Sequence, residues 1–423
     1  MRSSSKQNCS PKGFNIIAKP TGPACNLDCR YCFYTEKESL FPKNHTYRMN
    51  DEVLETFIRK YIESQPLPEV PFVWQGGEPA LMGLDFYREA IRLQKKYAGG
   101  RQISNSLQTN GTLLDENWCE FMAGNNFLVG LSIDGPEDIH NYYRVDHSGG
   151  PTFEAVIRGL ELLKKHGVEF NVLACVTRQN VTRPLDTYRF FKEQGVRFIQ
   201  FIPIVERQPD RAAEGLGLRL AAPAAAEQED TSEQVTEWSV EPAAYGDFLI
   251  KIFNEWVRTD VGRVFVMNFE WALASWVNGI TPACTFSESC GRCLVMEHNG
   301  DVYSCDHYVY PEHCLGNIMN DELGEMVESE KQIQFGRSKE TAISTRCRKC
   351  DVLFACHGDC PKHRFMKLRE GQPGVSYLCE SYKRFFKHIA PYMKKIRQLI
   401  RQGRPAEMIM ELQGKMEPED ASR

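Results

Sequence analysis

The chain has 423 residues, a net charge of −5, a hydrophobic content of 42% and a charged content of 25%. These are ordinary globular values, and this length can form two or three domain cores. The negative charge argues against nucleic acid as the main partner, and no apolar run is long enough to span a membrane. The start, MRSSSKQNCSPKG, has no apolar signal segment, so we expect a cytoplasmic protein without a disulfide framework.

Strand-like and helix-like segments alternate through the first half of the chain. The apolar segment 14–18 is the first predicted strand, and further strands are expected at 70–74, 103–108, 127–133, 168–176 and 197–203. Helices are expected at 51–64, with Asn50 as the N-cap, and at 85–97, 115–123, 152–166 and 184–194. This alternation predicts an α/β domain over 14–205, with a parallel sheet and right-handed crossovers.

The remaining segments differ in character. Residues 1–13 are expected to be a tail, and the Ala/Glu-rich segment 206–241 a flexible insertion, because it has few large apolar groups. A connecting helical region is expected at 242–283, with a helix at 243–258, before a cysteine-rich domain at 284–385. Residues 386–423 should form a basic helix and, beyond about Gln402, a disordered tail. A solvated face is the ordinary interpretation of this basic helix, and docking of an acidic partner is the alternative.

The most informative motif directly follows the first predicted strand. Cys25, Cys29 and Cys32 form a C-x3-C-x2-C triplet, followed by Phe33 and Tyr34. Three thiolates on one tight loop can hold three irons of a 4Fe–4S cube and leave the fourth iron open to an outside ligand. A zinc loop is the alternative for this triplet.

A second set of cysteines lies in the C-terminal third. The pattern C-x9-G-x4-C begins at Cys290, and the pattern C-x2-C-x5-C-x3-C begins at Cys347. With two flanking cysteines this set provides eight thiolates, the number that two fully protein-ligated cubes need. Structural zinc is the alternative, and Cys293 or Cys314 could take the place of one ligand. The eight candidates are Cys284, Cys290, Cys305, Cys347, Cys350, Cys356, Cys360 and Cys379.

The chain resembles the anaerobic sulfatase-maturating enzymes over about residues 13–400. The features that carry the resemblance are the triplet, the Gln-Gly-Gly-Glu-Pro turn at 75–79, the segment 132–136 and the Cys305-Asp306 pair. These are radical S-adenosylmethionine (SAM) enzymes with a SPASM extension. The resemblance implies a partial (β/α)6 barrel and a SPASM domain with two auxiliary 4Fe–4S clusters, in addition to the cluster that binds SAM. It also implies that the auxiliary ligands interleave. One cluster would use Cys284, Cys290, Cys305 and Cys360, and the other Cys347, Cys350, Cys356 and Cys379.

The resemblance also implies which residues contact SAM. The two glycines of the turn would let the backbone approach the methionine moiety, and a glutamate can accept a hydrogen bond from its ammonium. A guanidinium fork suits its carboxylate, and a tyrosine would lie near the adenine. Asn110, in the segment 108–111, is interpreted as a turn residue. The implied cofactor contacts are Tyr34, Gly76, Gly77, Glu78, Ser132 and Arg144.

The implied activity is oxidation of a sulfatase cysteine or serine to Cα-formylglycine. A 5′-deoxyadenosyl radical would abstract hydrogen, Asp306 would act as general base, and the auxiliary clusters would accept the electron. The expected partners are the sulfatase polypeptide and a reductant such as flavodoxin or ferredoxin. One alternative is another SPASM peptide maturase that forms side-chain crosslinks. Another is an iron–sulfur carrier or zinc scaffold, which would not account for the Gly-Gly-Glu-Pro turn.

Overall fold

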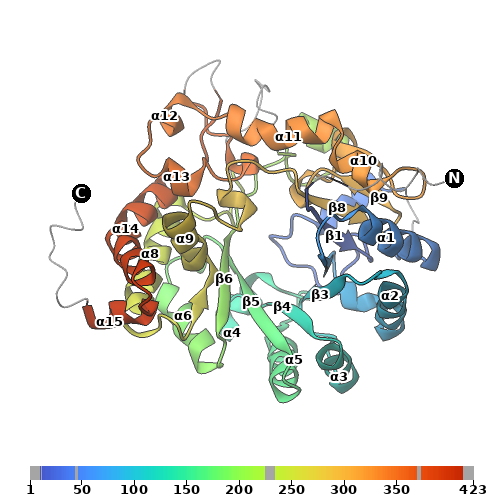
Figure 1. The fold of residues 1–423 in the computed structure, drawn as a ribbon, viewed down its shortest axis with the longest axis horizontal. Helices are drawn as coiled ribbons and strands as arrows, with labels where there is room; N and C mark the ends of the chain where they lie inside the picture. Colours follow the sequence, from blue (N-terminus) through green and yellow to red (C-terminus); the bar gives the residue numbers. More distant parts are fainter. Residues whose placement is uncertain (1–9, 11, 43–45, 224–233, 369–372, 413–423) are drawn as a thin grey trace.

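One continuous sheet organises the molecule (Figure 1). The computed structural model describes residues 10, 12–42, 46–223, 234–368 and 373–412. In this part of the chain the strands form a ten-stranded sheet in the order β10-β9-β8-β1-β2-β3-β4-β5-β6-β7. None of the helices in the same residues has the length and apolar character needed to cross a bilayer.

The predicted six-stranded parallel sheet is confirmed. Strands β1 to β6 are neighbours in chain order, and every neighbouring pair is parallel. The helices that connect them lie on the outer side of the curved sheet (Figure 1). The strands are β1 (Asn15–Lys19), β2 (Glu69–Trp74), β3 (Gln102–Thr109), β4 (Phe127–Ser132), β5 (Glu169–Val176) and β6 (Phe198–Pro203). The helices of this region are α1 (Asp51–Ser64), α2 (Leu84–Tyr97), α3 (Glu116–Gly124), α4 (Glu137–Tyr143), α5 (Phe153–Lys165) and α6 (Pro184–Glu193).

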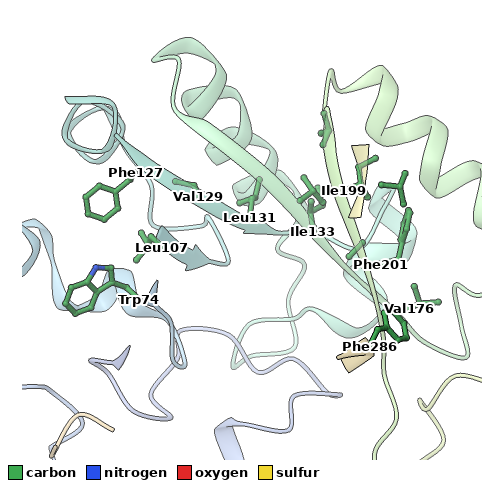
Figure 2. Close-up of a cluster of buried hydrophobic side chains, with 14 of the residues drawn as sticks. Trp74, Leu107, Phe127, Val129, Leu131, Ile133, Val176, Ile199, Phe201 and Phe286 are labelled. Atoms are coloured by element: carbon green, nitrogen blue, oxygen red, sulfur yellow. The ribbon is translucent and has the colours of Figure 1, made fainter. Parts of the chain in front are cut away.

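Local sequence signals account for most of these elements. The side chain of Asn50 caps α1 by accepting a hydrogen bond of 2.9 Å from the Val53 amide, as predicted. Along β2 to β6, apolar side chains alternate with more exposed ones and pack into one core (Figure 2). Trp74, Leu131 and Phe201 are at most 1% exposed there. The core therefore fixes the strand register, and so the positions of the loops that follow the strands.

Four short strands were not predicted. β7 (Phe265–Val266) extends the sheet beyond β6, and β8 (Cys293–Glu297) pairs in parallel with β1 at the opposite edge. β9 (Asp301–Tyr303) and β10 (Cys314–Asn317) then follow as antiparallel strands. Because β8 joins β1, the cysteine-rich region continues the barrel sheet, and its loops lie beside the first cysteine loop.

Helices build the rest of the cysteine-rich half. α8 and α14 pack against each other, and α12 and α13 lie near the start of α14 (Figure 1). The helices are α7 (Arg211–Gly215), α8 (Pro242–Thr259), α9 (Met267–Asn278), α10 (Leu323–Val327), α11 (Glu330–Thr341), α12 (Thr345–Arg348), α13 (Leu353–Cys356), α14 (Cys379–Arg401) and α15 (Ile409–Leu412). Short 3-10 helices are η1 (Thr35–Leu40), η2 (Pro79–Met82), η3 (Cys284–Phe286), η4 (Asp306–Tyr308), η5 (Pro311–His313), η6 (Pro361–His363) and η7 (Ala406–Met408).

Two segments are more ordered than their composition suggests. In the predicted flexible insertion, Leu218 and Leu220 are 4% exposed, and the Glu36 carboxylate accepts a hydrogen bond of 2.7 Å from the Arg219 amide. The described ends of the insertion, 206–223 and 234–241, are therefore folded onto the molecule, and residues 224–233 lie outside the described residues. The tail expected to be disordered beyond Gln402 forms η7 and α15, with Ile409 fully buried, and residues 413–423 lie outside the described part.

Candidate active site and cluster ligands

The loop of the cysteine triplet leaves β1 and is held by residues of the next loops. The Asn110 side chain donates to the Asn26 amide oxygen at 2.9 Å, and Asn26 in turn donates to the Thr112 hydroxyl at 2.9 Å. A ring nitrogen of His147 lies 3.0 Å from the Cys25 carbonyl oxygen. Asn110 is therefore more than the turn residue that the sequence suggested, because it ties the triplet loop to the end of β3.

The three thiols of the triplet lie close enough to influence one another electrostatically. Burial raises the pKa of Cys25 to about 12, and charge on Cys32 contributes to this shift. Burial also raises the pKa of Cys29, while the Arg144 guanidinium opposes that shift. A bound cation would reverse this preference, because metal coordination stabilises thiolates. The arrangement suits a cluster site.

The Gly-Gly-Glu-Pro turn packs directly on this loop. The Gly77 amide donates to the Gly22 carbonyl oxygen at 2.8 Å, and the Glu78 amide donates to the Ala24 carbonyl oxygen at 2.9 Å. A Cβ atom on Gly77 would collide with the Ala24 carbonyl group, and Gly76 has a φ of 149°. The glycines are therefore required for close approach of two backbones, whether or not a ligand is bound.

The Glu78 carboxylate, an expected cofactor contact, is hydrogen-bonded within the chain. The side chain is fully buried and accepts hydrogen bonds from the Ala80 amide, the Thr109 hydroxyl and the Asn110 amide at 2.8 to 2.9 Å. Burial raises the pKa of Glu78 to about 7 despite these bonds. Both carboxylate oxygens are thus bonded to the chain itself, and the side chain acts to join the turn to the end of β3.

Arg144 lies beside the triplet, within an ion pair. Its Nε atom is 3.0 Å from the Oδ2 atom of Asp134, and its side chain is 8% exposed. Asp134 also accepts hydrogen bonds from the Tyr31 hydroxyl at 2.6 Å and the Cys175 amide at 2.9 Å. Asp134 therefore orients Arg144 toward the cluster loop. Ser132 ends β4 just before this aspartate and is 8% exposed.

Tyr34 belongs to a second polar group, on the β8 side of the triplet. Its hydroxyl donates to the Glu297 carboxylate, and the Lys19 ammonium lies 3.9 Å from the centre of its ring. Lys19 is 1% exposed and its Nζ atom is 2.6 Å from the Oδ1 atom of Asp306. Tyr34 thus lies in the same polar group as the proposed base Asp306, and its expected position near the adenine of SAM stays a prediction.

The environment of Asp306 keeps its carboxyl group ionised. Burial raises its pKa, but the Lys19 ammonium is the main charge that opposes this effect, and the pKa is held below its ordinary value. The Lys19 ammonium also donates to the Gln75 side-chain oxygen at 3.3 Å. Asp306 is therefore a buried carboxylate that can accept a proton, as a general base must.

The eight candidate cysteines of the C-terminal half lie in two groups, and their assignment to clusters stays a prediction. In the first group, charges on Cys360 and Cys284 act on Cys305, whose pKa burial raises strongly. Charge on Cys284 also contributes to the raised pKa of Cys290. The second group lines one cavity of about 80 Å³, with Arg346, Lys349 and Lys383 among the other lining residues. The cysteines of that cavity are Cys347, Cys350, Cys356 and Cys379.

The spacing of these thiols differs from that of a single-ion site. Within the described residues, no three side chains of His, Cys, Asp or Glu are arranged to chelate one metal ion. A zinc ion bound by thiolates at about 2.3 Å would bring the sulfur atoms within about 4 Å of one another. In a cube each thiolate binds a different iron, so the sulfur atoms of the thiolates lie farther apart. A cube therefore needs a wider arrangement of thiolates than a zinc ion does.

Two further cysteines had been considered as substitute ligands. Cys293 begins β8, and charges on Cys284 and Asp306 contribute to the rise of its pKa to about 12, behind burial. It therefore lies between the first group and the proposed base. Cys314 is on β10, and its thiol lies 3.8 Å from the Gly316 carbonyl oxygen. Of the two, Cys293 has the position closer to a ligand set.

Comparisons with known proteins agree with the site. A model of the radical SAM superfamily matches residues 20–191, and one of an iron–sulfur cluster-binding domain (SPASM) matches residues 284–351. A serine-type anaerobic sulfatase-maturating enzyme of Bacteroides thetaiotaomicron is 48% identical over 95% of both chains. A cysteine-type enzyme of Clostridium perfringens is 34% identical over 89% of this chain and 96% of its own.

Solved structures give the same result. Native anSMEcpe with bound AdoMet and the Cp18Cys peptide has a TM-score of 0.78 and 34% identity, over 91% of this chain and 99% of its own. Streptococcus suis SuiB, at 14% identity and a TM-score of 0.59, shares the fold alone. The sequence similarity, which spans both the barrel and the cysteine-rich half, shows that this protein belongs to the anaerobic sulfatase-maturating enzymes of the radical SAM superfamily.

Proposed function

We propose that this chain is a serine-type enzyme, which oxidises a serine of a sulfatase polypeptide to Cα-formylglycine. The observation that carries the proposal is the buried pair of Lys19 and Asp306, because it places an ionised base directly after Cys305 of the first cysteine group. The serine type is supported by relatives with 48% and 40% identity that are named serine-type, against 34% for a cysteine-type relative.

Eleven cysteines would hold the three iron–sulfur clusters. The triplet of Cys25, Cys29 and Cys32 would hold the cluster that binds SAM, and the two groups of the C-terminal half would hold one auxiliary cluster each. Bound there, SAM and the clusters supply the hydrogen-abstracting radical and one-electron transfer. The residues of the chain bind these groups, exclude water and move a proton.

The roles of individual residues follow from their positions. Arg144, held by Asp134, has a guanidinium suited to the carboxylate of SAM, and Ser132 at the end of β4 is proposed as a neighbouring contact. The backbone of Gly76 and Gly77, and not the Glu78 carboxylate, is proposed to face the cofactor. Asp306 accepts the hydroxyl proton of the target serine as the carbonyl double bond forms, and Lys19 holds Asp306 in place.

The partners follow from this reaction. The substrate is a sulfatase polypeptide, and an electron-carrier protein such as flavodoxin or ferredoxin is proposed to deliver the starting electron. A carrier or scaffold without catalysis is excluded, because the chain belongs to a family of enzymes. Crosslinking is the less supported alternative, because the relatives of 34% to 48% identity reported above are named sulfatase-maturating enzymes.

The test is a direct assay of two peptides. The protein is reconstituted anaerobically with iron and sulfide and incubated with SAM, a reductant and sulfatase-derived peptides that differ only in serine or cysteine at the target position. The serine peptide should lose two mass units and react with an aldehyde probe. Faster conversion of the cysteine peptide would contradict the serine type, and loss of two mass units without an aldehyde would favour crosslinking.

A further inference from the structure

The cavity of the second cysteine group opens onto a strongly basic surface. Three cationic side chains line it: Arg346, Lys349 and Lys383. Arg348 and Lys387 lie in the same two segments, and we call the five residues the basic rim. The segments 345–351 and 379–387 contain six basic and two acidic residues. They form α12 with the residues after it and the beginning of α14, which lie close together in Figure 1. This local excess contrasts with the net charge of −5 of the whole chain.

Most of the rim is not neutralised by neighbouring carboxylates. Lys387 lies 3.3 Å from Asp351, and Arg348 donates to the Thr341 carbonyl oxygen at 3.1 Å. Arg346, Lys349 and Lys383 line the cavity and form no ion pair with any other described residue. Pairing with carboxylates therefore does not account for these three cations. A cluster held by four thiolates would balance part of their charge, and the five cations of the rim would still leave this surface basic.

An exposed aromatic ring belongs to α13, whose Leu353 and Cys356 line the same cavity. Phe354 on α13 is 44% exposed, and its ring centre lies 4.7 Å from that of Trp276. An aromatic group beside several unneutralised charges is typical of a surface for transient protein docking, where charge guides the encounter and a small apolar contact completes it.

The reaction releases one electron at the substrate in each turnover. Reductive cleavage of SAM consumes one electron. When the hydrogen-depleted serine becomes an aldehyde, its O–H bond breaks, the proton passes to Asp306, the C=O double bond forms and one electron is released. An oxidised one-electron carrier protein can take up that electron and become reduced, which completes the balance.

We propose that the basic rim is the docking surface for a small acidic electron-carrier protein, which exchanges this electron with the cluster held by Cys347, Cys350, Cys356 and Cys379. The inference rests on the proposed function, because it requires a redox cluster in this cavity. The first cysteine group connects this cavity with the site of Asp306 along the chain. Its member Cys305 directly precedes Asp306, and its member Cys360 lies four residues after Cys356 of the cavity.

Binding measurements can test the surface without relying on turnover. Oxidised flavodoxin, and in a parallel arm an acidic ferredoxin, is titrated into the reconstituted enzyme at low and moderate salt by isothermal calorimetry. The test variant is Arg346→Glu/Lys349→Glu. The control is Lys394→Glu/Arg401→Glu, which reverses two exposed charges farther along α14. Iron content and an EPR spectrum establish that each variant keeps its clusters.

The rim variant should bind at least one carrier about tenfold or more weakly than the wild type does, and the control variant should bind as the wild type does. The affinity of the wild type should fall as the salt concentration rises. If the charge reversal disturbs the clusters, Arg346→Gln/Lys349→Gln gives the same comparison with a smaller expected effect. Equal affinities of the rim and control variants for the carrier would overturn the inference. It would also be overturned if the rim variant bound a sulfatase peptide more weakly than the wild type does but bound the carrier equally well. A wild type that makes no formylglycine would instead contradict the proposed function, whatever its affinity for the carrier.

Discussion

The Lys19 ammonium lies 2.6 Å from the Asp306 carboxylate, where the end of β1 meets the loop after β9. Lys19 is in register with Glu297 at the end of β8, so the pairing of β1 with β8 brings barrel and cysteine-rich residues into one polar group. Burial of Lys19 to 1% exposure makes the ion pair strong, because little water screens it. The barrel thus supplies the counter-ion of the proposed base.

The first prediction concerns this counter-ion. In Lys19→Met, the Asp306 carboxylate loses its partner, so proton acceptance should fail while hydrogen abstraction still occurs. The ratio of 5′-deoxyadenosine to formylglycine should rise about a hundredfold, the scale of a lost general base. Lys19→Arg should restore part of the coupling. The matched control is Lys60→Met, which removes another buried lysine, paired at 2.8 Å with Glu322. A parallel loss of both products in Lys19→Met would indicate a structural role only.

The second prediction concerns metal content. Three cubes require about twelve irons per chain, and replacing Cys25, Cys29 and Cys32 with alanine should leave about eight. Cys293→Ser should keep all twelve if the assigned ligand set is correct. The measurement is iron, sulfide and zinc analysis of the reconstituted protein. Stoichiometric zinc, or loss of about four irons in Cys293→Ser, would contradict the assignment.

The third prediction separates Glu78 from the cofactor. A glutamine there places an NH2 group opposite N–H or O–H donors, so Glu78→Gln should lower the stability of the apo-protein by about 1–3 kcal/mol. It should also weaken iron binding by the triplet more than by the other cysteines. Glu89→Gln, which removes an exposed ion pair with Arg92 on α2, should change stability by less than about 1 kcal/mol. Unchanged stability with weaker SAM binding in Glu78→Gln would return Glu78 to the role of cofactor ligand.

The sequence was sufficient for the strands of the barrel. Periodic apolar positions around residues such as Trp74 and Phe201 predicted β1 to β6 to within two residues, because those strands are buried on the core side. A strand as short as β9, with three residues, has too few positions for a periodic signal. β8 is as long as β1, but it lies between the expected cluster ligands Cys290 and Cys305, where no strand was expected. Because β8 was not predicted, its pairing with β1 was not predicted either. The sequence therefore did not indicate that Lys19 and Glu297 are neighbours of Asp306. In the insertion, apolar residues such as Leu218 are few among the alanines and glutamates. The sequence therefore gave only a weak indication that the ends of the insertion fold.

The last prediction isolates the proposed base itself. Asp306→Asn keeps the size of the side chain but removes its ability to accept a proton at neutral pH. It also removes the negative charge that balances Lys19, so a buried ammonium is left without its 2.6 Å partner and some loss of stability is expected. Because hydrogen abstraction precedes deprotonation, 5′-deoxyadenosine should still form in the presence of the peptide. Formylglycine should fall about a hundredfold or more.

The measurement for Asp306→Asn is the ratio of 5′-deoxyadenosine to oxidised peptide in a single turnover, with iron content equal to that of the wild type. Asp301→Asn serves as the control, because Asp301 lies on the adjacent strand β9 and bonds only to nearby asparagines in the contacts seen among the described residues. The double variant Lys19→Met/Asp306→Asn removes both charges. If Lys19 acts only through Asp306, the double variant should show the ratio of Asp306→Asn and no further increase. An unchanged ratio in Asp306→Asn would exclude it as the base and leave Tyr34 or Glu297 as the nearest candidates.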